Sequence, residues 1–310
     1  MIGLAILFGT ALGLLIAGLS AMLVHEMRHP PRRTAGYALA HAMATDPSDL
    51  GLDFEQWMLT LGNGIALPVW DVRGLASDEK ERITTVLAHG WGHSRIHSLE
   101  RVKAFLPHCH RVLMYDLRGH GEAKGGSSRL GDREQKDLIE LLKASRRMDE
   151  PSSSGERFVL AGHSMGAVIC LAAAAEHARL NDVETVDIAG VIAYGPYTKF
   201  HRSLIGRLKA AGLPARPMTD LALAWHGLTG VRPLSLRDEA LRQVNCPVLI
   251  VHGGKDVVAP IEHGEHIASI VPGTVFELFL DAGHVDAHVK DVERHAQLIA
   301  EFFQRVAVKQ

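Results

Sequence analysis

The clearest chemical signal in the sequence is a serine between two glycines, in Gly162-His163-Ser164-Met165-Gly166. An apolar run, 158–161, leads into it, and an alanine-rich segment, 165–177, follows it. A chain that turns sharply from strand to helix leaves no room for side chains two positions before and after the apex, so glycine fits at both places. The apex serine then stands at a helix N-terminus, where backbone N–H groups favour developing negative charge. The pattern predicts a nucleophilic serine.

A serine hydroxyl needs a base to accept its proton and an anion to orient that base. Asp256 follows the apolar run 247–252, and His284 follows the run 275–280. Both residues thus come after strands, as Ser164 does, and the carboxyl ends of parallel strands meet at one edge of a sheet. We therefore expect Ser164, His284 and Asp256 to form a catalytic triad.

Nearby residues leave alternatives to these assignments. Glu262 or Asp281 could serve as the acid, and His288 could serve as the base. His288 and Asp286 could instead hold a metal ion on a helix face. We expect neither a metal nor a cofactor at this site.

A possible oxyanion site follows the apolar run 83–88, in His89-Gly90-Trp91-Gly92. The backbone N–H groups of Trp91 and of Met165, the residue after the serine, are the expected donors to the oxyanion. The two glycines allow the backbone to approach the substrate closely. The Trp91 indole either walls the pocket or only packs, and His93 either contacts the substrate or closes the turn.

The elements that position these residues alternate along the chain between short apolar runs and helical segments. Such alternation predicts a parallel sheet with helices on both faces, the α/β class. Two earlier runs, 54–61 and 65–72, are joined by a Gly-Asn-Gly turn and predict an antiparallel hairpin. Residues 198–244 exceed the length of one crossover and form either a small helical cap over the site or a long plain connection.

These motifs together resemble the α/β-hydrolase superfamily over about residues 54–306. The resemblance also rests on three further segments: Asp116-Leu117-Arg118-Gly119-His120-Gly121, Gly254-Lys255-Asp256-Val257-Val258-Ala259-Pro260 and Ala282-Gly283-His284. It implies hydrolysis of an ester, thioester or amide without a cofactor, with Asp116 and His120 holding the oxyanion loop. Haloalkane dehalogenases and epoxide hydrolases carry an aspartate where this chain has Ser164, so their chemistries are not expected.

Three other histidines near the motifs have structural interpretations. The side chain of His163 is expected to point into the fold, and His263 and His266 are expected on the surface of a helix.

Residues 2–24 contain no charged side chain. At about 1.5 Å per residue they reach roughly 34 Å as a helix, enough to cross a bilayer core. No basic residue precedes them and no small-x-small site ends them, which favours an uncleaved anchor over a signal peptide. Arg28, Arg32 and Arg33 follow, so the positive-inside rule places the bulk of the chain in the cytoplasm.

Three segments are expected: the anchor (2–24), a juxtamembrane linker (25–52) and a hydrolase domain (53–310) with its insertion at about 198–244. The anchor and the basic, proline-containing stretch after it are similar to membrane-anchored Bem46-like and serine-aminopeptidase-like hydrolases.

The composition excludes several classes of protein. Lys and Arg number 33 against 35 Asp and Glu, which leaves no basic field for nucleic acid. Cys109, Cys170 and Cys246 form no CxxC pair, which argues against a disulfide framework and a structural zinc site and favours buried free thiols.

The expected activity is hydrolysis of a carboxylic ester through an acyl-enzyme at Ser164. The anchor suggests lipid-like substrates at the membrane, although a cap could also admit small soluble esters. Two alternatives are an acyltransferase that uses the same acyl-enzyme, and a non-catalytic scaffold on the same fold.

Overall fold

The computed structural model describes residues 2–76, 82–148, 155–180, 186–228 and 230–307. At its centre is an eight-stranded sheet with the order β1-β2-β4-β3-β5-β6-β7-β8. The strands are β1 (Phe54–Thr60), β2 (Ala66–Arg73), β3 (Ile83–Ala88), β4 (Arg111–Tyr115), β5 (Arg157–His163), β6 (Asp187–Tyr194), β7 (Val248–Gly253) and β8 (Val275–Phe279).

The sheet is parallel from β4 to β8 and antiparallel at its N-terminal edge. The β1–β2 hairpin pairs Leu59 with Leu67. Its turn needs a glycine at Gly64, where φ is +77°. The mixed α/β architecture and the hairpin expected from the sequence are confirmed.

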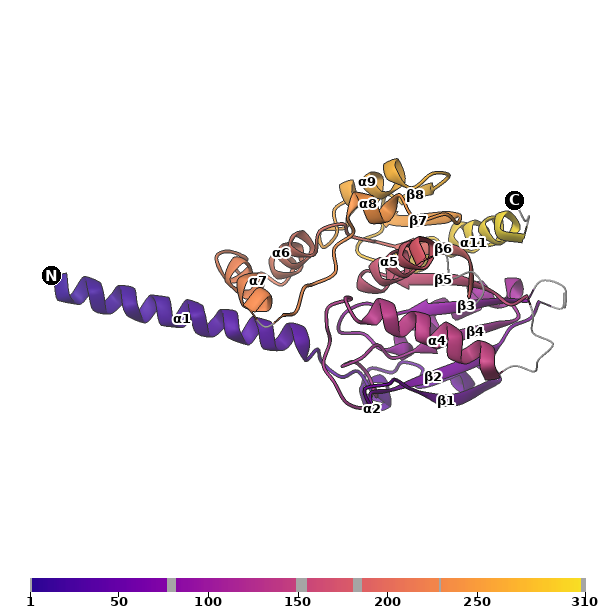
Figure 1. The fold of residues 1–310 in the computed structure, drawn as a ribbon, viewed down its shortest axis with the longest axis horizontal. Helices are drawn as coiled ribbons and strands as arrows, with labels where there is room; N and C mark the ends of the chain where they lie inside the picture. Colours follow the sequence, from indigo (N-terminus) through magenta and orange to yellow (C-terminus); the bar gives the residue numbers. More distant parts are fainter. Residues whose placement is uncertain (1, 77–81, 149–154, 181–185, 229, 308–310) are drawn as a thin grey trace.

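Helices cover both faces of the sheet (Figure 1). On one face lie α4 (Glu134–Met148), α5 (Met165–Leu180), α8 (Asp238–Leu241) and α9 (Glu262–Ile270). On the other lie α2 (Ala35–Ala40), α3 (Leu99–Phe105), α10 (Ala287–Lys290) and α11 (Val292–Ala307).

Each central strand contributes side chains alternately to two apolar cores. In β4, Leu113 and Tyr115 belong to the core under α4 and α5, whereas Val112 and Met114 belong to the core under α3 and α11. Burial on both faces explains why these strands are apolar throughout.

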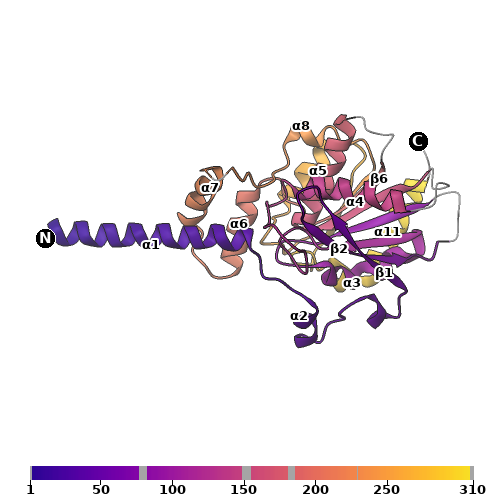
Figure 2. The ribbon, with the colours of Figure 1, turned by 60° about the horizontal axis from the view of Figure 1, so that its bottom comes forward.

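Helix α1 (Ile2–Arg28) projects from the body and is, among the described residues, the one helix long and apolar enough to cross a membrane (Figures 1 and 2). It continues four residues past the expected anchor. The segment expected as a linker also contains α2, whose Ala38 is buried in the core, and a 3-10 turn, Pro47–Leu50. Much of it therefore packs against the body.

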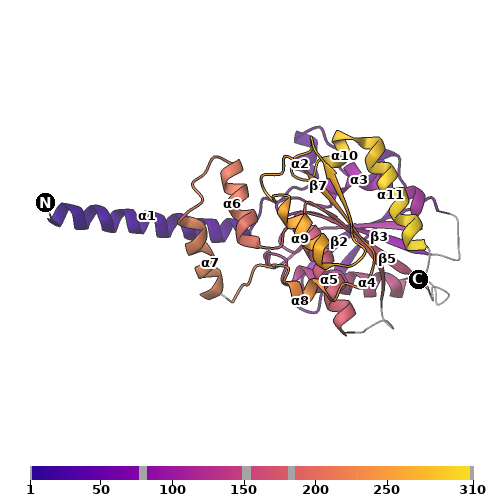
Figure 3. The same cartoon turned by 90° about the horizontal axis from the view of Figure 1, so that it is seen from above.

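The insertion forms a helical cap of α6 (Phe200–Ala210) and α7 (Met218–Leu228), followed by α8 and an irregular return to β7. Figure 3 shows α6 and α7 on either side of the C-terminal half of α1. Helix α7 packs directly against α1.

Candidate active site

Ser164 occupies a strained turn between β5 and α5. Its φ is +53°, in the left-handed region that non-glycine residues rarely adopt. A Cβ atom on Gly162 would lie 2.4 Å from the backbone of Gly166, and one on Gly166 would lie 2.1 Å from the carbonyl oxygen of Ala88. Both glycines are thus required sterically by the turn that presents the serine.

His284 lies in the loop after β8 and faces the serine. Its Nε2 is 2.9 Å from Ser164 Oγ, and its Nδ1 is 2.7 Å from Asp256 Oδ2. Because the carboxylate accepts a hydrogen bond from Nδ1–H, the neutral imidazole presents an unprotonated Nε2 to the hydroxyl. The three residues that the sequence singled out therefore form one chain of hydrogen bonds.

The Asp256 carboxylate is fully buried and held by the loop that carries it. Its Oδ1 accepts hydrogen bonds from the backbone N–H groups of Val258 and Ala259, at 2.9 and 2.8 Å. These bonds leave Oδ2 to orient His284. On the same side, buried His252 bonds through Nε2 to the carbonyl oxygen of Ala259 at 2.7 Å, which fixes the other end of the loop.

Buried histidines form hydrogen bonds that hold the proposed oxyanion loop, His89-Gly90-Trp91-Gly92, in place. His163 Nε2 accepts the Gly90 N–H at 3.0 Å and lies 3.0 Å from His93 Nδ1. Burial, with the nearby Arg101 charge, keeps the pKa of His163 well below its usual value, so its ring stays neutral and able to accept. His89 accepts the N–H of Leu117 in the same way.

Of the two expected oxyanion donors, Met165 directly follows Ser164 in the chain, and Trp91 lines the pocket that contains Ser164. Met165 begins α5, so its N–H has no acceptor within the helix. Trp91 lines the same pocket as Ser164, and its indole N–H donates to the carbonyl oxygen of Met27 in α1 at 2.9 Å.

Asp116 acts structurally in this arrangement. It accepts the backbone N–H of Arg95 at 2.7 Å and forms a buried ion pair with the Arg95 guanidinium. Arg95 lies three residues after Gly92, the last residue of the proposed oxyanion loop, so this pair fixes the chain shortly beyond the loop. His120 is also buried, and its Nδ1 donates to the carbonyl oxygen of Arg118.

The alternative acids and base lie elsewhere. Asp281 is exposed and pairs with Lys255, and Glu262 is exposed on α9. His288 contacts Glu100 at 3.3 Å. Among the described residues, no cluster of three or more His, Cys, Asp or Glu side chains is arranged to hold a metal ion.

The surface assignment of His263 is wrong. Its side chain is buried, and Nδ1 lies 2.8 Å from Thr198 Oγ1. The start of the insertion covers this part of α9, which helical spacing alone does not reveal. His266, in contrast, is exposed and pairs with Asp238.

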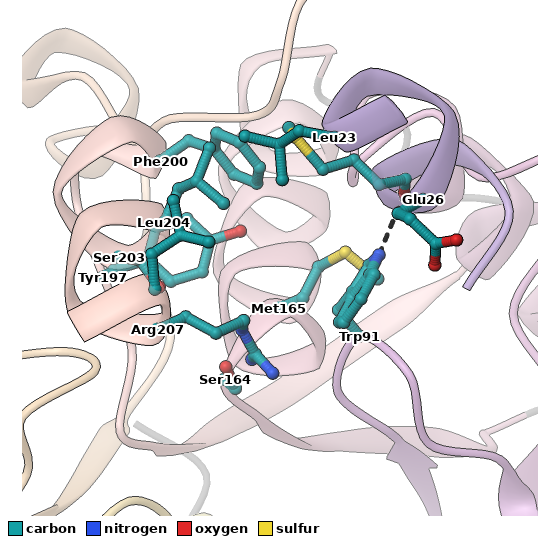
Figure 4. A pocket seen from close by; sticks show the side chains of 12 residues that line it. Leu23, Glu26, Trp91, Ser164, Met165, Tyr197, Phe200, Ser203, Leu204 and Arg207 are labelled. Atoms are coloured by element: carbon teal, nitrogen blue, oxygen red, sulfur yellow. Dashed lines mark hydrogen bonds between the residues drawn. The ribbon is translucent and has the colours of Figure 1, made fainter. Parts of the chain in front are cut away.

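A largely apolar pocket of about 120 Å³ leads to Ser164 (Figure 4). Three helices contribute to it, through the C-terminal turns of α1, the cap helix α6 and the start of α5, together with Trp91 and Tyr197 from two loops. Its lining residues are Leu23, Glu26, Met27, Trp91, Ser164, Met165, Tyr197, Phe200, Ser203, Leu204, Arg207 and Leu208.

Residues 85–301 match the family described as alpha/beta hydrolases. The chain belongs to the alpha/beta hydrolase family. It is 26% identical over 233 residues to the protein YqkD of Bacillus subtilis, covering 72% of each chain. It is 23% identical over 210 residues to a human serine hydrolase, covering 62% of this chain and 69% of that one.

The fold of this alpha/beta hydrolase is similar to that of an esterase from Pyrococcus furiosus, with a TM-score of 0.69. The two chains are 20% identical, and the match covers 90% of this chain and 98% of the other. An esterase from Exiguobacterium antarcticum matches with a TM-score of 0.60 at 19% identity, over 81% of this chain and all of the other.

Sequence reasoning missed several pocket residues of this hydrolase. Leu23, Glu26 and Met27 belong to a segment expected only to anchor or link, and Arg207 lies on a cap helix. For Arg207, the sequence offered one signal: polar or basic residues at helical spacing within 198–244. Nothing local in α1 indicates that its last turns line the pocket that contains Ser164.

Proposed function

We propose that this alpha/beta hydrolase is a serine hydrolase that cleaves carboxylic esters through an acyl-enzyme. The observation that carries the proposal is the hydrogen-bonded chain from Ser164 Oγ through His284 to buried Asp256. The esterase neighbours support the same class of reaction.

In the first step Ser164 Oγ attacks the carbonyl carbon while His284 Nε2 takes the hydroxyl proton. Asp256 stabilises the imidazolium that forms. The N–H groups of Trp91 and Met165 donate to the tetrahedral oxyanion. The C–O bond to the alcohol then breaks, and His284 returns the proton to the leaving oxygen. Water, activated by His284, releases the acid from Ser164 by the reverse sequence.

We further propose that α1 is a retained membrane anchor with the catalytic domain on the cytoplasmic side. Removal of α1 as a signal peptide would strip Leu23, Glu26 and Met27 from the pocket wall and delete the acceptor of the Trp91 indole N–H. A retained anchor places the site at a bilayer, which favours lipid-like esters as substrates.

The test is a series of p-nitrophenyl esters of increasing acyl length, hydrolysed by the full chain in detergent, beside Ser164→Ala. Turnover by the wild type and its loss in Ser164→Ala are expected. Methanol or an amine, added as a competing nucleophile, distinguishes hydrolysis from acyl transfer through the products. Equal turnover by both proteins contradicts the assignment.

A further inference from the structure

We propose that the cap helix α7 rests in the bilayer interface beside α1, so that the catalytic pocket opens at headgroup depth and takes its substrate directly from the membrane. This inference rests on the proposed anchoring of α1 and on the proposed ester hydrolysis.

The fully exposed part of α1 is too short to cross a bilayer core by itself. Within residues 2–15 every side chain that the structure describes is exposed, whereas Ser20, Val24 and Met27 are buried. Fourteen residues reach only about 21 Å, and a hydrocarbon core is about 30 Å thick. If α1 spans the bilayer, residues beyond 15 must enter it too, and α7 packs beside that half of the helix (Figures 1 and 3).

Helix α7 has a buried inner side and an exposed apolar outer face. Thr219, Ala222 and His226 are buried on its inner side. Leu221, Trp225 and Leu228, at spacings of four and three, form one outer face and are 38%, 41% and 85% exposed. Tryptophan is enriched at membrane–water interfaces, so an exposed face with a tryptophan between two leucines suits that depth.

The pocket meets α1 near the end of the apolar part of that helix. Its α1 residues are Leu23, Glu26 and Met27, at the point where the apolar run ends and charged residues begin. That boundary lies at the depth of the headgroups if the apolar run fills the core. The apolar α6 side chains Phe200 and Leu204 continue the wall from there towards Ser164 (Figure 4). An acyl chain can therefore pass from the bilayer to the serine along apolar surface.

The test uses Leu221→Asp/Leu228→Asp in the full chain, reconstituted in phosphatidylcholine vesicles. Leu180→Asp, at the exposed far end of α5, is the matched control. We expect hydrolysis of a fluorogenic long-chain ester in the bilayer to fall at least tenfold, and that of soluble p-nitrophenyl butyrate to stay within twofold. An unchanged rate on the bilayer ester, or an equal loss on both esters, overturns the inference.

A second readout is independent of catalysis. Trp225→Cys and Leu180→Cys are each labelled with an environment-sensitive dye, since Cys109 and Cys170 are buried and Cys246 is only partly exposed. We expect blue-shifted emission and quenching by spin-labelled lipid at 225, and water-like emission at 180. Water-like emission at both sites overturns the inference. Absence of turnover by the wild type on every ester contradicts the proposed function instead and leaves this readout intact.

The pocket also contains a positively charged side chain, that of Arg207. Arg207 lines it together with Ser164, and its guanidinium lies over the Trp91 ring at 5.1 Å. Among the described residues it forms no ion pair with a carboxylate. Glu26 lines the same pocket without pairing with it, and buried Asp256, which acts on Arg207 from a longer distance, is already bonded to His284. A partly buried charge of this kind is costly unless an anion joins it. We infer that Arg207 binds an anionic group, such as a headgroup phosphate, on the ester substrate.

The assay for this inference compares lysophosphatidate with a monoacylglycerol of the same chain, for the wild type, Arg207→Gln and Arg207→Lys. We expect Arg207→Gln to raise KM for the anionic ester at least ten times more than KM for the neutral ester, and Arg207→Lys to recover part of that difference. Equal losses on both esters, or no loss on either, overturn the assignment.

Discussion

Replacing Asp256 by Asn tests how this carboxylate orients His284, the histidine of the proposed triad. The asparagine oxygen can still accept the N–H groups of Val258 and Ala259, which now bond to Oδ1 at 2.9 and 2.8 Å. The amide NH₂ group then replaces Oδ2, 2.7 Å from His284 Nδ1. Because NH₂ is a donor, the imidazole proton must move to Nε2, where it faces Ser164 Oγ.

A histidine with its proton on Nε2 cannot accept the serine proton. The corresponding change in serine proteases lowers kcat by about 10⁴, equivalent to about 5 kcal/mol of transition-state stabilisation. We expect a fall of about 10³ to 10⁴ in kcat for Asp256→Asn. KM should change less than about threefold, because the carboxylate does not line the substrate pocket.

The assay is steady-state hydrolysis of p-nitrophenyl butyrate, with thermal unfolding as a check on folding. Asp281→Asn is the matched control, since it removes an exposed carboxylate from the neighbouring loop. It should retain nearly full kcat. If Asp256→Asn keeps more than a tenth of wild-type kcat, or if Asp281→Asn loses as much, the orientation argument is refuted.

Three further changes test the turn, the pocket and the buried histidines. Gly166→Ala places a Cβ atom 2.1 Å from the Ala88 carbonyl oxygen, so thermal melts should show that the free energy of unfolding falls by about 1–3 kcal/mol. An unchanged melting temperature contradicts the steric requirement for glycine. Met27→Trp narrows the pocket and should lower kcat/KM for a dodecanoyl ester at least tenfold relative to an acetyl ester; a uniform effect on both excludes Met27 from the acyl site. Burial lowers the pKa of His120 and His295 to about 4. The unfolded chain therefore binds more protons between about pH 6.5 and 4, and the stability present above pH 6.5 is lost on acidification, by on the order of 3 kcal/mol for each histidine. Urea midpoints at pH 7.5, 5.5 and 4.5 should fall in that order, and a flat series contradicts this.

The fold and the candidate triad follow from local signals in the sequence. Ser164 is marked by its two glycines, and Asp256 and His284 are marked by the apolar strands before them. These signals suffice because parallel strands end at one edge, so residues distant in the chain meet without any long-range information.

The substrate side of the site depends on packing between segments that carry no such signal. Met27 reaches the pocket only because the cap folds against α1, and His263 is buried only because the chain near Thr198 crosses α9. Helical periodicity identifies the face of a helix but not which distant element covers it. In the sequence, Arg207 is one basic residue among several in the insertion, and only the folded cap shows that it lines the pocket.

The most direct measurement for the central claim is peptide mapping by mass spectrometry after the full chain reacts with a fluorophosphonate. We expect one covalent adduct, on Ser164, formed at a rate that drops sharply in His284→Ala. An adduct on another residue, or the same rate of labelling without the imidazole, would contradict a nucleophile activated by His284.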